Sequence, residues 1–370
     1  MKIVVATDNY PPRYDGISRF LQEILPALAN VHDVSVIAPD FGPSSDPWPV
    51  TKIPVTRLRV GDFHPAGLHG IRVFRATKGA DVVFVQALGS IGLAAFFAAK
   101  LRRQKVVLYT HSVEWELVPK SLGVNILRRL LPGIIKSFSR LIYRGIDLLI
   151  FPSVGVSEAY FWNKIENKRV IIHLGVDTKK FFPAKSKKKA KTSLGIDPDA
   201  FVVGYHGRLA REKDLKTLLR AWLSFRSRNP GVNTHLLIVG DGLREIRQLF
   251  DRDGVTVTGF QEDVVPYLHA MDAYVLSSLT ETSCLSVMEA MSCGLPVVST
   301  PVGYIPDYIT HEKNGLLFEE KSAVLLTRHL EQLLNTGVRR RLGRSARKTI
   351  EERFSWDATR EQVLSVFERI

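Results

Sequence analysis

Short, almost continuously apolar runs recur along this chain, and amphipathic stretches separate several of them. In the first half the runs are KIVVAT, DVSVIA, DVVFVQ, KVVLYT and DLLIFPS; in the second half they are FVVGYHG, HLLIVGD, VTVTGF, AYVLSS and PVVST. Apolar strands that alternate with helices are typical of parallel sheets covered by helices on both faces. The sequence therefore predicts an α/β protein with two doubly wound, Rossmann-like domains.

The chain has 370 residues, which is enough for two domains of ordinary size. We place their boundary within IIHLGVDTKKFFP, residues 171–183, because this stretch combines a turn-forming Gly-Val-Asp with a proline. The N-terminal domain is expected over residues 1–172 and the C-terminal domain over residues 173–354. The pattern of residues 355–370 predicts one amphipathic helix, which we expect to pack back on the N-terminal domain.

Composition argues against several classes of protein. The two cysteines, Cys284 and Cys293, make neither a disulfide framework nor a metal-ligand spacing, which favours a reduced, cytosolic setting. The N-terminal run IVVAT is too short for a secretory signal. The uncharged stretch 82–99 has the minimum length of a membrane span, but glycine and polar residues interrupt it. A strand, a loop and a helix are the preferred interpretation.

The formal net charge is +14, and the positive residues are clustered. Residues 100–144 contain ten Lys or Arg against two Glu, and further runs are KSKKKAK (185–191) and RRRLGRSARK (339–348). Such a field attracts nucleic acid, anionic lipid or phosphorylated ligands. We interpret residues 185–191 as a flexible, solvated surface loop. A nucleic-acid binder is disfavoured because the basic stretches lack the interleaved aromatic residues on which bases stack.

Several polar residues follow predicted strands, where ligands bind in open parallel sheets. Gly16 opens a helix after the first strand, and a glycine there suits an anionic ligand. His111 follows KVVLYT. Arg208 follows Gly207 at the end of FVVGYHG, and Lys213 comes shortly after; these two cations suit phosphate oxygens. The dinucleotide pattern GxGxxG and the phosphate loop GxxxxGK[ST] are both absent, which disfavours simple dehydrogenases and P-loop proteins.

The stretch ETSCLSVMEAMSCGLPVVST, residues 281–300, holds two glutamates beside a predicted helix that starts near Cys284 or Leu285. Glu281 precedes this helix, and Glu289 lies in its early turns. The unpaired backbone N–H groups of Ser283 and the next two residues are expected to point at an anion. Carboxylates bind paired hydroxyls well, as in the ribose contact of dinucleotide sites. A diphosphate beside a polyol indicates a nucleotide-sugar.

With these motifs the sequence resembles the GT-B glycosyltransferases of family 4 over nearly its whole length. The most specific element is the E-x7-E pattern from Glu281 to Glu289, which continues into EAMSCGLPVVST. Arg208 and Lys213 match the diphosphate-binding pair of that family, and the histidine in YTHS matches its active-site histidine. Gly16, with Ile17, matches its N-terminal glycine loop, although Asp replaces the first glycine of the usual Gly-Gly.

The resemblance implies transfer of a hexose from a nucleotide-diphosphate sugar, with retention of anomeric configuration. The nucleotide-sugar is a substrate, no cofactor or essential metal is expected, and a UDP-sugar such as UDP-glucose is preferred for its frequency. Glu289 is expected to bind the ribose, Glu281 the transferred sugar, and the backbone at Phe260 the base. His111 is expected to contact the sugar and to stabilise the positive charge of an oxocarbenium-like transition state. Cations and helix N–H groups stabilise the departing diphosphate.

The acceptor is expected to be a membrane lipid. Residues 120–144 are basic and apolar, with Arg128, Arg129 and Lys136 beside an apolar cluster, which suits an interfacial segment on anionic lipid. This places the enzyme in the cytoplasm, peripherally associated with the inner face of the cell membrane. A packed helix with a solvated basic face is the alternative for this segment. A soluble sugar, glycan or small-molecule acceptor also stays open, whereas E-x7-E disfavours a nucleotide-sugar 2-epimerase.

Overall fold

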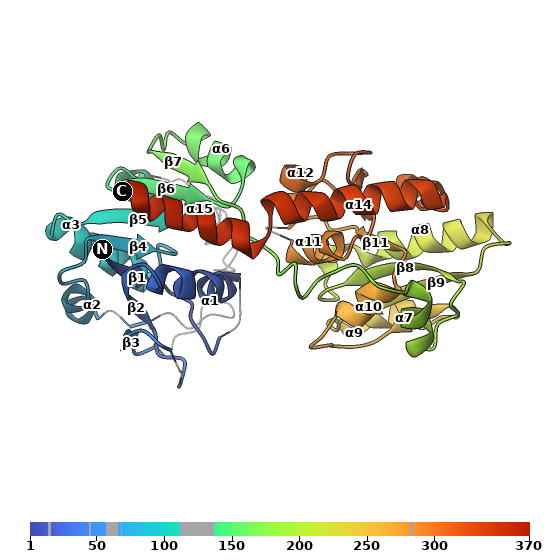
Figure 1. The fold of residues 1–370 in the computed structure, drawn as a ribbon, viewed down its shortest axis with the longest axis horizontal. Helices are drawn as coiled ribbons and strands as arrows, with labels where there is room; N and C mark the ends of the chain where they lie inside the picture. The colour runs from blue at the N-terminus through green and yellow to red at the C-terminus, as the bar shows by residue number, and fades with distance from the viewer. Residues whose placement is uncertain (14–15, 44–45, 57–65, 68, 112–136, 282–283) are drawn as a thin grey trace, which may run out of the picture. The chain divides into compact units, whose positions relative to one another are not determined.

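The computed structural model describes residues 1–13, 16–43, 46–56, 66–67, 69–111, 137–281 and 284–370. The chain divides into two compact units, each built on one parallel β-sheet with helices between its strands (Figure 1). Unit 1 consists of Met1–His173 and Arg360–Ile370, and unit 2 of Leu174–Thr359. The predicted α/β class, with two doubly wound Rossmann-like sheets, is confirmed.

Unit 1 contains a seven-stranded sheet in the order β3-β2-β1-β4-β5-β6-β7. Its strands are β1 (Lys2–Ala6), β2 (Asp33–Pro39), β3 (Val50–Ile53), β4 (Val82–Val85), β5 (Lys105–Tyr109), β6 (Leu148–Phe151) and β7 (Arg169–Ile171). Its described helices include α1 (Gly16–Ala29), α2 (Gly70–Ala76), α3 (Ser90–Leu101), residues 137–143, α6 (Val154–Trp162) and the end of α15 (Trp356–Arg369). The strand order reverses between β1 and β4, which makes their carboxyl ends the usual place for a ligand.

Unit 2 contains a six-stranded sheet in the order β10-β9-β8-β11-β12-β13. Its strands are β8 (Phe201–His206), β9 (Thr234–Val239), β10 (Val255–Val257), β11 (Ala273–Leu276), β12 (Val297–Ser299) and β13 (Leu316–Leu317). Its longer helices are α8 (Leu215–Arg228), α11 (Leu285–Ser292), α13 (Ala323–Gln332) and α14 (Thr336–Arg353). Shorter ones are α7 (Lys187–Ser193), α9 (Arg244–Arg247), α10 (Val265–Ala270) and α12 (Ile305–Tyr308). Here the strand order reverses between β8 and β11.

The apolar runs of the sequence form the interiors of both sheets, as predicted. Three short strands were not expected, namely β3, β7 and β13, and each lies at the edge of its sheet. Edge strands are short and carry polar residues, here Thr51, Lys52 and Arg169, so they lack a continuous apolar signal. The preferred interpretation of residues 82–99 is confirmed, because they form β4, a loop and most of α3. Among the described residues, no helix is long and apolar enough to cross a membrane.

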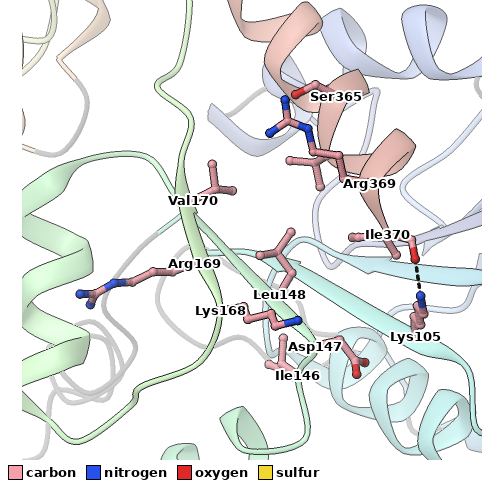
Figure 2. A pocket seen from close by; sticks show the side chains of 11 residues that line it. Lys105, Ile146, Asp147, Leu148, Lys168, Arg169, Val170, Ser365, Arg369 and Ile370 are labelled. Atoms are coloured by element: carbon pink, nitrogen blue, oxygen red, sulfur yellow. Dashed lines mark hydrogen bonds between the residues drawn. The ribbon is translucent and has the colours of Figure 1, made fainter.

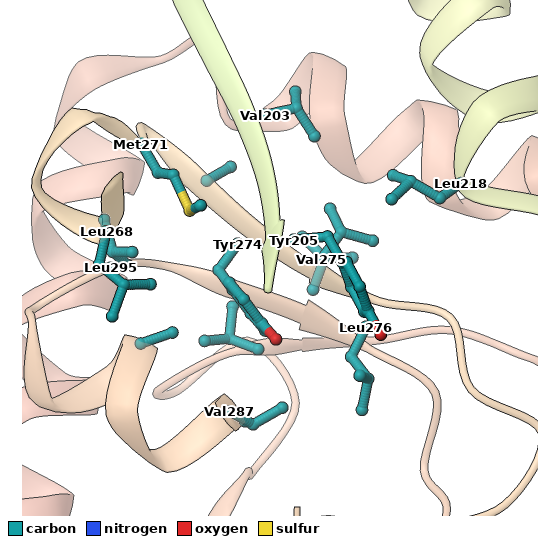
Figure 3. Close-up of a cluster of buried hydrophobic side chains, with 14 of the residues drawn as sticks. Val203, Tyr205, Leu218, Leu268, Met271, Tyr274, Val275, Leu276, Val287 and Leu295 are labelled. Atoms are coloured by element: carbon teal, nitrogen blue, oxygen red, sulfur yellow. The ribbon is translucent and has the colours of Figure 1, made fainter. Parts of the chain in front are cut away.

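The core of unit 2 depends on close contact between β8 and the residues before β11 (Figure 3). Met271 packs directly on the backbone of β8 at Gly204, where an added Cβ would lie 2.1 Å from the methionine sulfur. Tyr205 and Tyr274 are fully buried in the same cluster. Burying such aromatic side chains contributes several kcal/mol, on the order of 25 cal/mol per Å². The two strands that flank the reversal are therefore held firmly together.

The basic run 185–191 is not the flexible loop that we expected, because most of it lies in α7. Lys191 is buried, and its Nζ lies 2.7 Å from Oδ2 of Asp272 and donates to the carbonyl of Ala200 at 2.8 Å. Lys187 donates to the carbonyl of Met271 at 2.6 Å, and burial lowers its pKa to about 8. A buried carboxylate requires such partners, so these lysines join α7 to the start of β11.

Lys191→Ala is expected to lower the free energy of unfolding by about 3–5 kcal/mol, because Asp272 then stays buried without its closest cation. Urea denaturation measures this change. The control is Lys188→Ala in the same helix: Lys188 pairs with Asp199 at 2.6 Å, but the two side chains are 70% and 72% exposed. Its unfolding midpoint is expected to stay that of the parent protein. Equal losses in both variants would contradict the structural role of Lys191.

Candidate active site

The carboxyl ends of β8 and β11 carry most of the residues that the sequence predicts for the site. Lys213 ends a 3-10 turn (Arg211–Lys213) in the loop after β8, and Glu281 lies in the loop after β11. Nζ of Lys213 lies 2.6 Å from Oε1 of Glu281. Ser278 donates its hydroxyl to the same oxygen at 2.6 Å. The side chains of Lys213 and Glu281 are only 18% and 9% exposed, so this ion pair is largely shielded from solvent.

Backbone contacts hold the two loops in register. The hydroxyl of Ser277 donates to the carbonyls of Lys213 and Asp214, both at 3.0 Å, and the N–H of Leu279 donates to the carbonyl of Glu212 at 2.8 Å. Asp214 has a left-handed backbone with φ of 41°, which turns the chain into α8. The position of the Lys213 ammonium is therefore set by the fold before any ligand binds.

Arg208 lies at the same edge but is not part of this ion pair. Its Nη2 lies 2.7 Å from Oε1 of Glu212, and its side chain is 72% exposed. The preceding Gly207 has φ of +143° and approaches the loop after β9 closely, because a Cβ on Gly240 would lie 2.0 Å from the Gly207 carbonyl oxygen. Only glycine fits this approach, which fixes the direction in which the chain leaves β8. The guanidinium of Arg208 therefore faces solvent, with Glu212 as its partner.

The helix α11 begins at Leu285, as predicted, and Cys284 precedes it with a left-handed φ of 41°. Burial first, and the neighbouring Glu281 second, raise the pKa of the Cys284 thiol to about 12. This cysteine is therefore a neutral thiol at physiological pH and not a nucleophile. Leu285, half-buried, supplies the first backbone N–H of the helix. Ser283, which the sequence predicts for the same anion contact, lies outside the described residues.

Glu289 lies in the second turn of α11 and is 8% exposed. Nε2 of His206, the last residue of β8, is 2.8 Å from Oε2 of Glu289. Each glutamate of the E-x7-E pattern therefore has a basic partner. Glu281 pairs with Lys213 in the loop after β8, and Glu289 pairs with His206 at the end of β8. Phe260, in contrast, is 79% exposed in the loop after β10, and its side chain packs against little of the described protein.

In unit 1, polar residues also follow the strands that flank the reversal. His111 follows β5, and its Nε2 is 3.1 Å from Oε1 of Gln86, which follows β4. Asp8 follows β1 and accepts the backbone N–H groups of Ile91 and Gly92 at 3.0 and 3.2 Å, so it caps α3. Burial raises the pKa of Asp8, and these hydrogen bonds oppose the shift. The three side chains lie along one edge of the sheet.

The ring of His111 packs against Tyr109 and Phe20, with centroids 4.5 and 5.3 Å away. Burial lowers the pKa of His111 to about 3. The imidazole is therefore neutral near pH 7 and offers one donor and one acceptor rather than a positive charge. Gly16 and Ile17 form the start of α1, and the space beside Gly16 is open, because an added Cβ would meet nothing within 4 Å.

Two family models match the chain. One, described as Glycosyltransferase Family 4, matches residues 14–180, and the other, described as Glycosyl transferases group 1, matches residues 200–336. Together the two matches span most of both units. The chain belongs to the family 4 glycosyltransferases. It is an enzyme that transfers a hexose, as the resemblance implied.

Full-length relatives and solved structures agree with this assignment. A GDP-mannose-dependent alpha-mannosyltransferase of Mycobacterium tuberculosis (strain CDC 1551 / Oshkosh) is 26% identical, with 100% of this chain and 97% of the relative aligned. A GDP-mannose-dependent monoacylated alpha-(1-6)-phosphatidylinositol monomannoside mannosyltransferase of Corynebacterium glutamicum is 25% identical over 99% and 98% of the two chains. The crystal structure of Anabaena Alr3699/HepE in complex with UDP has a TM-score of 0.78 at 20% identity, covering 100% of both chains. This last likeness shows the fold, that of the GT-B glycosyltransferases.

Three polar contacts of this glycosyltransferase were missed in the sequence. Gln86 contacts His111, His206 contacts Glu289, and Ser278 contacts Glu281. Each of these residues lies at the end of an apolar strand or just after it, which is the position that drew attention to His111 and Arg208. The same rule applied to every polar residue in this position would have found them.

One cavity of unit 1 lies away from these residues. Its volume is about 720 Å³, and its lining includes Lys105, Leu148 and Arg169, which begin β5, β6 and β7 (Figure 2). The amino ends of parallel strands lie at the edge opposite their carboxyl ends, so this cavity is not where His111 and Gln86 lie. The basic segment 120–144, predicted to dock on a membrane, lies outside the described residues except for its end, where residues 137–143 are helical.

His111 is expected to stay neutral from pH 8 down to pH 5, because burial holds its pKa near 3. The pKa of His111 in the folded protein lies below the ordinary value of about 6.5. The free energy of unfolding is therefore expected to fall as the pH drops below about 6.5, because the unfolded chain then binds a proton at His111 and the folded chain does not. NMR titration of the imidazole resonance that is lost in His111→Gln measures this pKa. A midpoint between pH 6 and 7 would contradict the burial of the ring.

Proposed function

We propose that this glycosyltransferase moves a hexose from a nucleoside-diphosphate sugar to a hydroxyl of a membrane lipid, with retention of configuration and without an essential metal. The observation that carries the proposal is the Lys213–Glu281 pair at the reversal point of the second sheet. It places a shielded ammonium, a carboxylate and the amino end of α11 at one edge. That combination suits a diphosphate joined to polyols.

The cations act on the leaving group. As the bond between the anomeric carbon and the diphosphate oxygen breaks, the electron pair moves to the diphosphate, and Lys213 and Arg208 stabilise the growing negative charge. The backbone N–H groups that open α11 add partial positive charge on the same side. The acceptor hydroxyl forms the new bond and loses its proton to the departing diphosphate. Among the described residues, no group of three or more His, Cys, Asp or Glu is placed to hold a metal ion.

The carboxylates and His111 position the donor. Glu289 binds the ribose hydroxyls and Glu281 the hydroxyls of the transferred sugar, since ionised carboxylates only accept hydrogen bonds. His111, as a neutral hydrogen-bonding group, is assigned to the transferred sugar. Gly16, whose surroundings are open, lets the donor approach the backbone at the start of α1. The backbone at Phe260 is assigned to the base.

The proposal also concerns which nucleotide the donor carries. Frequency favours a UDP-sugar, and the full-length relatives that are named GDP-mannose-dependent favour a GDP-sugar. GDP-mannose is therefore the first donor to test and UDP-glucose the second. A phosphatidylinositol-type lipid is the first acceptor to test, because one relative is named for such a substrate.

A lipid acceptor requires a surface of the enzyme that meets the membrane, and unit 1 offers one. The helices α2, α3, 137–143 and α6 contact one another in a row, which we call the helical face. The guanidinium of Arg102, at the end of α3, stacks on the ring of Phe74 in α2, with its carbon 3.9 Å from the ring centroid. Gly145 abuts Phe96 of α3, and Nε of Arg140 donates to the carbonyl of Asn163 at the end of α6. Right-handed crossovers between parallel strands place α3, 137–143 and α6 on one side of the sheet.

The helical face is apolar and basic at its outer surface. Large apolar side chains that are more than half exposed on it are Ile71, Phe97, Leu101, Leu141 and Trp162. Exposed cations on these helices and in the segments that follow them are Arg72, Arg75, Lys78, Arg103, Arg144, Lys164 and Lys168, against the exposed acids Asp81, Asp147, Glu158 and Glu166. Exposed aromatic and aliphatic side chains enter the interfacial layer of a bilayer, while each nearby cation adds about 1 kcal/mol of attraction to anionic lipid. The helical face therefore supports peripheral association with an anionic membrane.

Lys213→Ala and Glu289→Ala are each expected to lower the transfer rate by about 10²-fold or more, because each removes a group that positions or stabilises the donor. Transfer of labelled mannose from GDP-mannose, and of glucose from UDP-glucose, to extracted lipid measures this loss. The control is Arg211→Ala in the same loop, since Arg211 is 83% exposed and pairs only with Glu245 among the described residues. Near-normal turnover in either site variant would discredit the assignment.

Binding to phosphatidylglycerol vesicles is expected at low salt, and binding to pure phosphatidylcholine vesicles is expected to be weaker by tenfold or more. The triple variant Leu101→Ser, Leu141→Ser and Trp162→Ser is expected to lose most of the binding, because it removes apolar groups from the helical face. The matched control changes three exposed apolar residues of unit 2, Leu223, Leu243 and Val324, to Ser. If the parent protein stays in the supernatant with anionic vesicles, a soluble acceptor is favoured instead.

A further inference from the structure

His206 is a buried titratable residue that no step of the proposed reaction uses. It ends β8 and is 5% exposed. The hydroxyl of Tyr274 donates to its carbonyl at 3.1 Å, and the two rings pack edge to face with centroids 5.3 Å apart. The neighbouring Gly207 fixes the backbone beyond it. The imidazole therefore has one well-defined position, between β11 and α11.

The side chain of His206 makes its contact with Glu289. A carboxylate only accepts hydrogen bonds, so Nε2 carries the proton and donates it to Oε2 at 2.8 Å. Both side chains are largely buried, at 6% and 10% exposure. A hydrogen bond to a buried, ionised carboxylate is shorter and stronger than one between neutral groups. It offsets part of the cost of removing the carboxylate of Glu289 from water.

The second ring nitrogen of His206 indicates why a histidine is present at this position. Nδ1 of His206 is buried and has no hydrogen-bond partner among the described residues. A buried polar atom without a partner costs about 1–3 kcal/mol, and an apolar side chain of similar volume would fill this space without that cost. The bond to Glu289 is the compensating feature that histidine adds here. Holding Oε2 also restrains rotation of the carboxylate, and with it the position of the second oxygen.

We propose that His206 is a positioning residue for the donor nucleotide: it orients the carboxylate of Glu289 for the ribose hydroxyls. This inference rests on the proposed function, in which Glu289 is the ribose ligand. It assigns to His206 a role in affinity for the ribose and none in the chemical step. The consequence is a specific one: loss of His206 weakens binding of a ribonucleotide more than binding of its deoxyribose counterpart.

The experiment measures binding of GDP and UDP, and of 2′-deoxy-GDP and 2′-deoxy-UDP, by isothermal titration calorimetry. The variants are His206→Leu, which removes the donor, and His206→Gln, whose amide nitrogen replaces Nε2. His206→Asn has a shorter amide, which does not reach Glu289, and it takes the place of His206→Leu if that variant does not fold. The control is His235→Leu on β9, because His235 also makes one side-chain hydrogen bond, to Thr256 at 2.9 Å.

The expected result is a loss of tenfold or more in ribonucleotide affinity for His206→Leu, with a clearly smaller loss for the 2′-deoxyribonucleotides, which keep only the 3′-hydroxyl. His206→Gln is expected to regain most of the loss, and His235→Leu to match the parent protein. In steady-state transfer, KM for the donor is expected to rise in His206→Leu while kcat changes by less than threefold.

Several results would overturn the inference. One is a His206→Leu protein that keeps the parent ratio of ribose to deoxyribose affinity. Another is a folded His206→Gln protein with no recovery, and a third is failure of both His206→Leu and His206→Asn to fold, which makes the role purely structural. A parent protein that binds neither GDP nor UDP refutes the proposed function itself. These outcomes are distinguishable, because only the last concerns the unmodified enzyme.

Discussion

Every strand in each sheet runs parallel to its neighbours, so all the loops that follow strands open at one edge. This constraint brings Lys213 and Glu281 to 2.6 Å although 68 positions separate them in the sequence. Their loops follow β8 and β11, the pair at which the strand order reverses. In unit 1 the same constraint aligns Asp8, Gln86 and His111 after β1, β4 and β5. Each sheet thus gathers its polar side chains where connections diverge and leave room for a ligand.

The polar groups at this edge of unit 2 are paired before any ligand arrives. Oε1 of Glu281 receives both Lys213 and Ser278, and Glu289 receives His206. A diphosphate that approaches Lys213 therefore competes with a carboxylate already in place. Exchange of one anion for another keeps the ammonium paired at every stage, which costs less than burying a bare charge. In the proposed function the released carboxylate of Glu281 then accepts sugar hydroxyls, which would couple the binding of phosphate and of sugar through one ion pair.

The sequence predicted the interior of this fold better than its margins. Nine of the ten apolar runs became central strands, which are buried on both faces, and the tenth, VTVTGF, became the edge strand β10. The edge strands β3, β7 and β13 carry mixed residues and were not predicted. The start of α11 was predicted from the change of polarity after Glu281. The partners of the glutamates were not, because Lys213 and His206 come from another strand end, and contacts across a sheet leave no local pattern. Arg208 and Glu212, in contrast, form a local pair only four residues apart.

The net charge of +14 divides into groups that composition alone does not separate. Lys191 forms a buried ion pair with Asp272 inside unit 2, and Arg347 of α14 donates to the carbonyls of Phe181 and Ser292. These two cations therefore stabilise the fold. Lys213 is shielded but paired with an exchangeable carboxylate, which is what a phosphate site requires. The exposed cations of the helical face outnumber the exposed acids there, and their field extends into solvent for about a Debye length. Burial and partner, rather than charge, therefore distinguish a structural lysine from one that meets a substrate or a membrane.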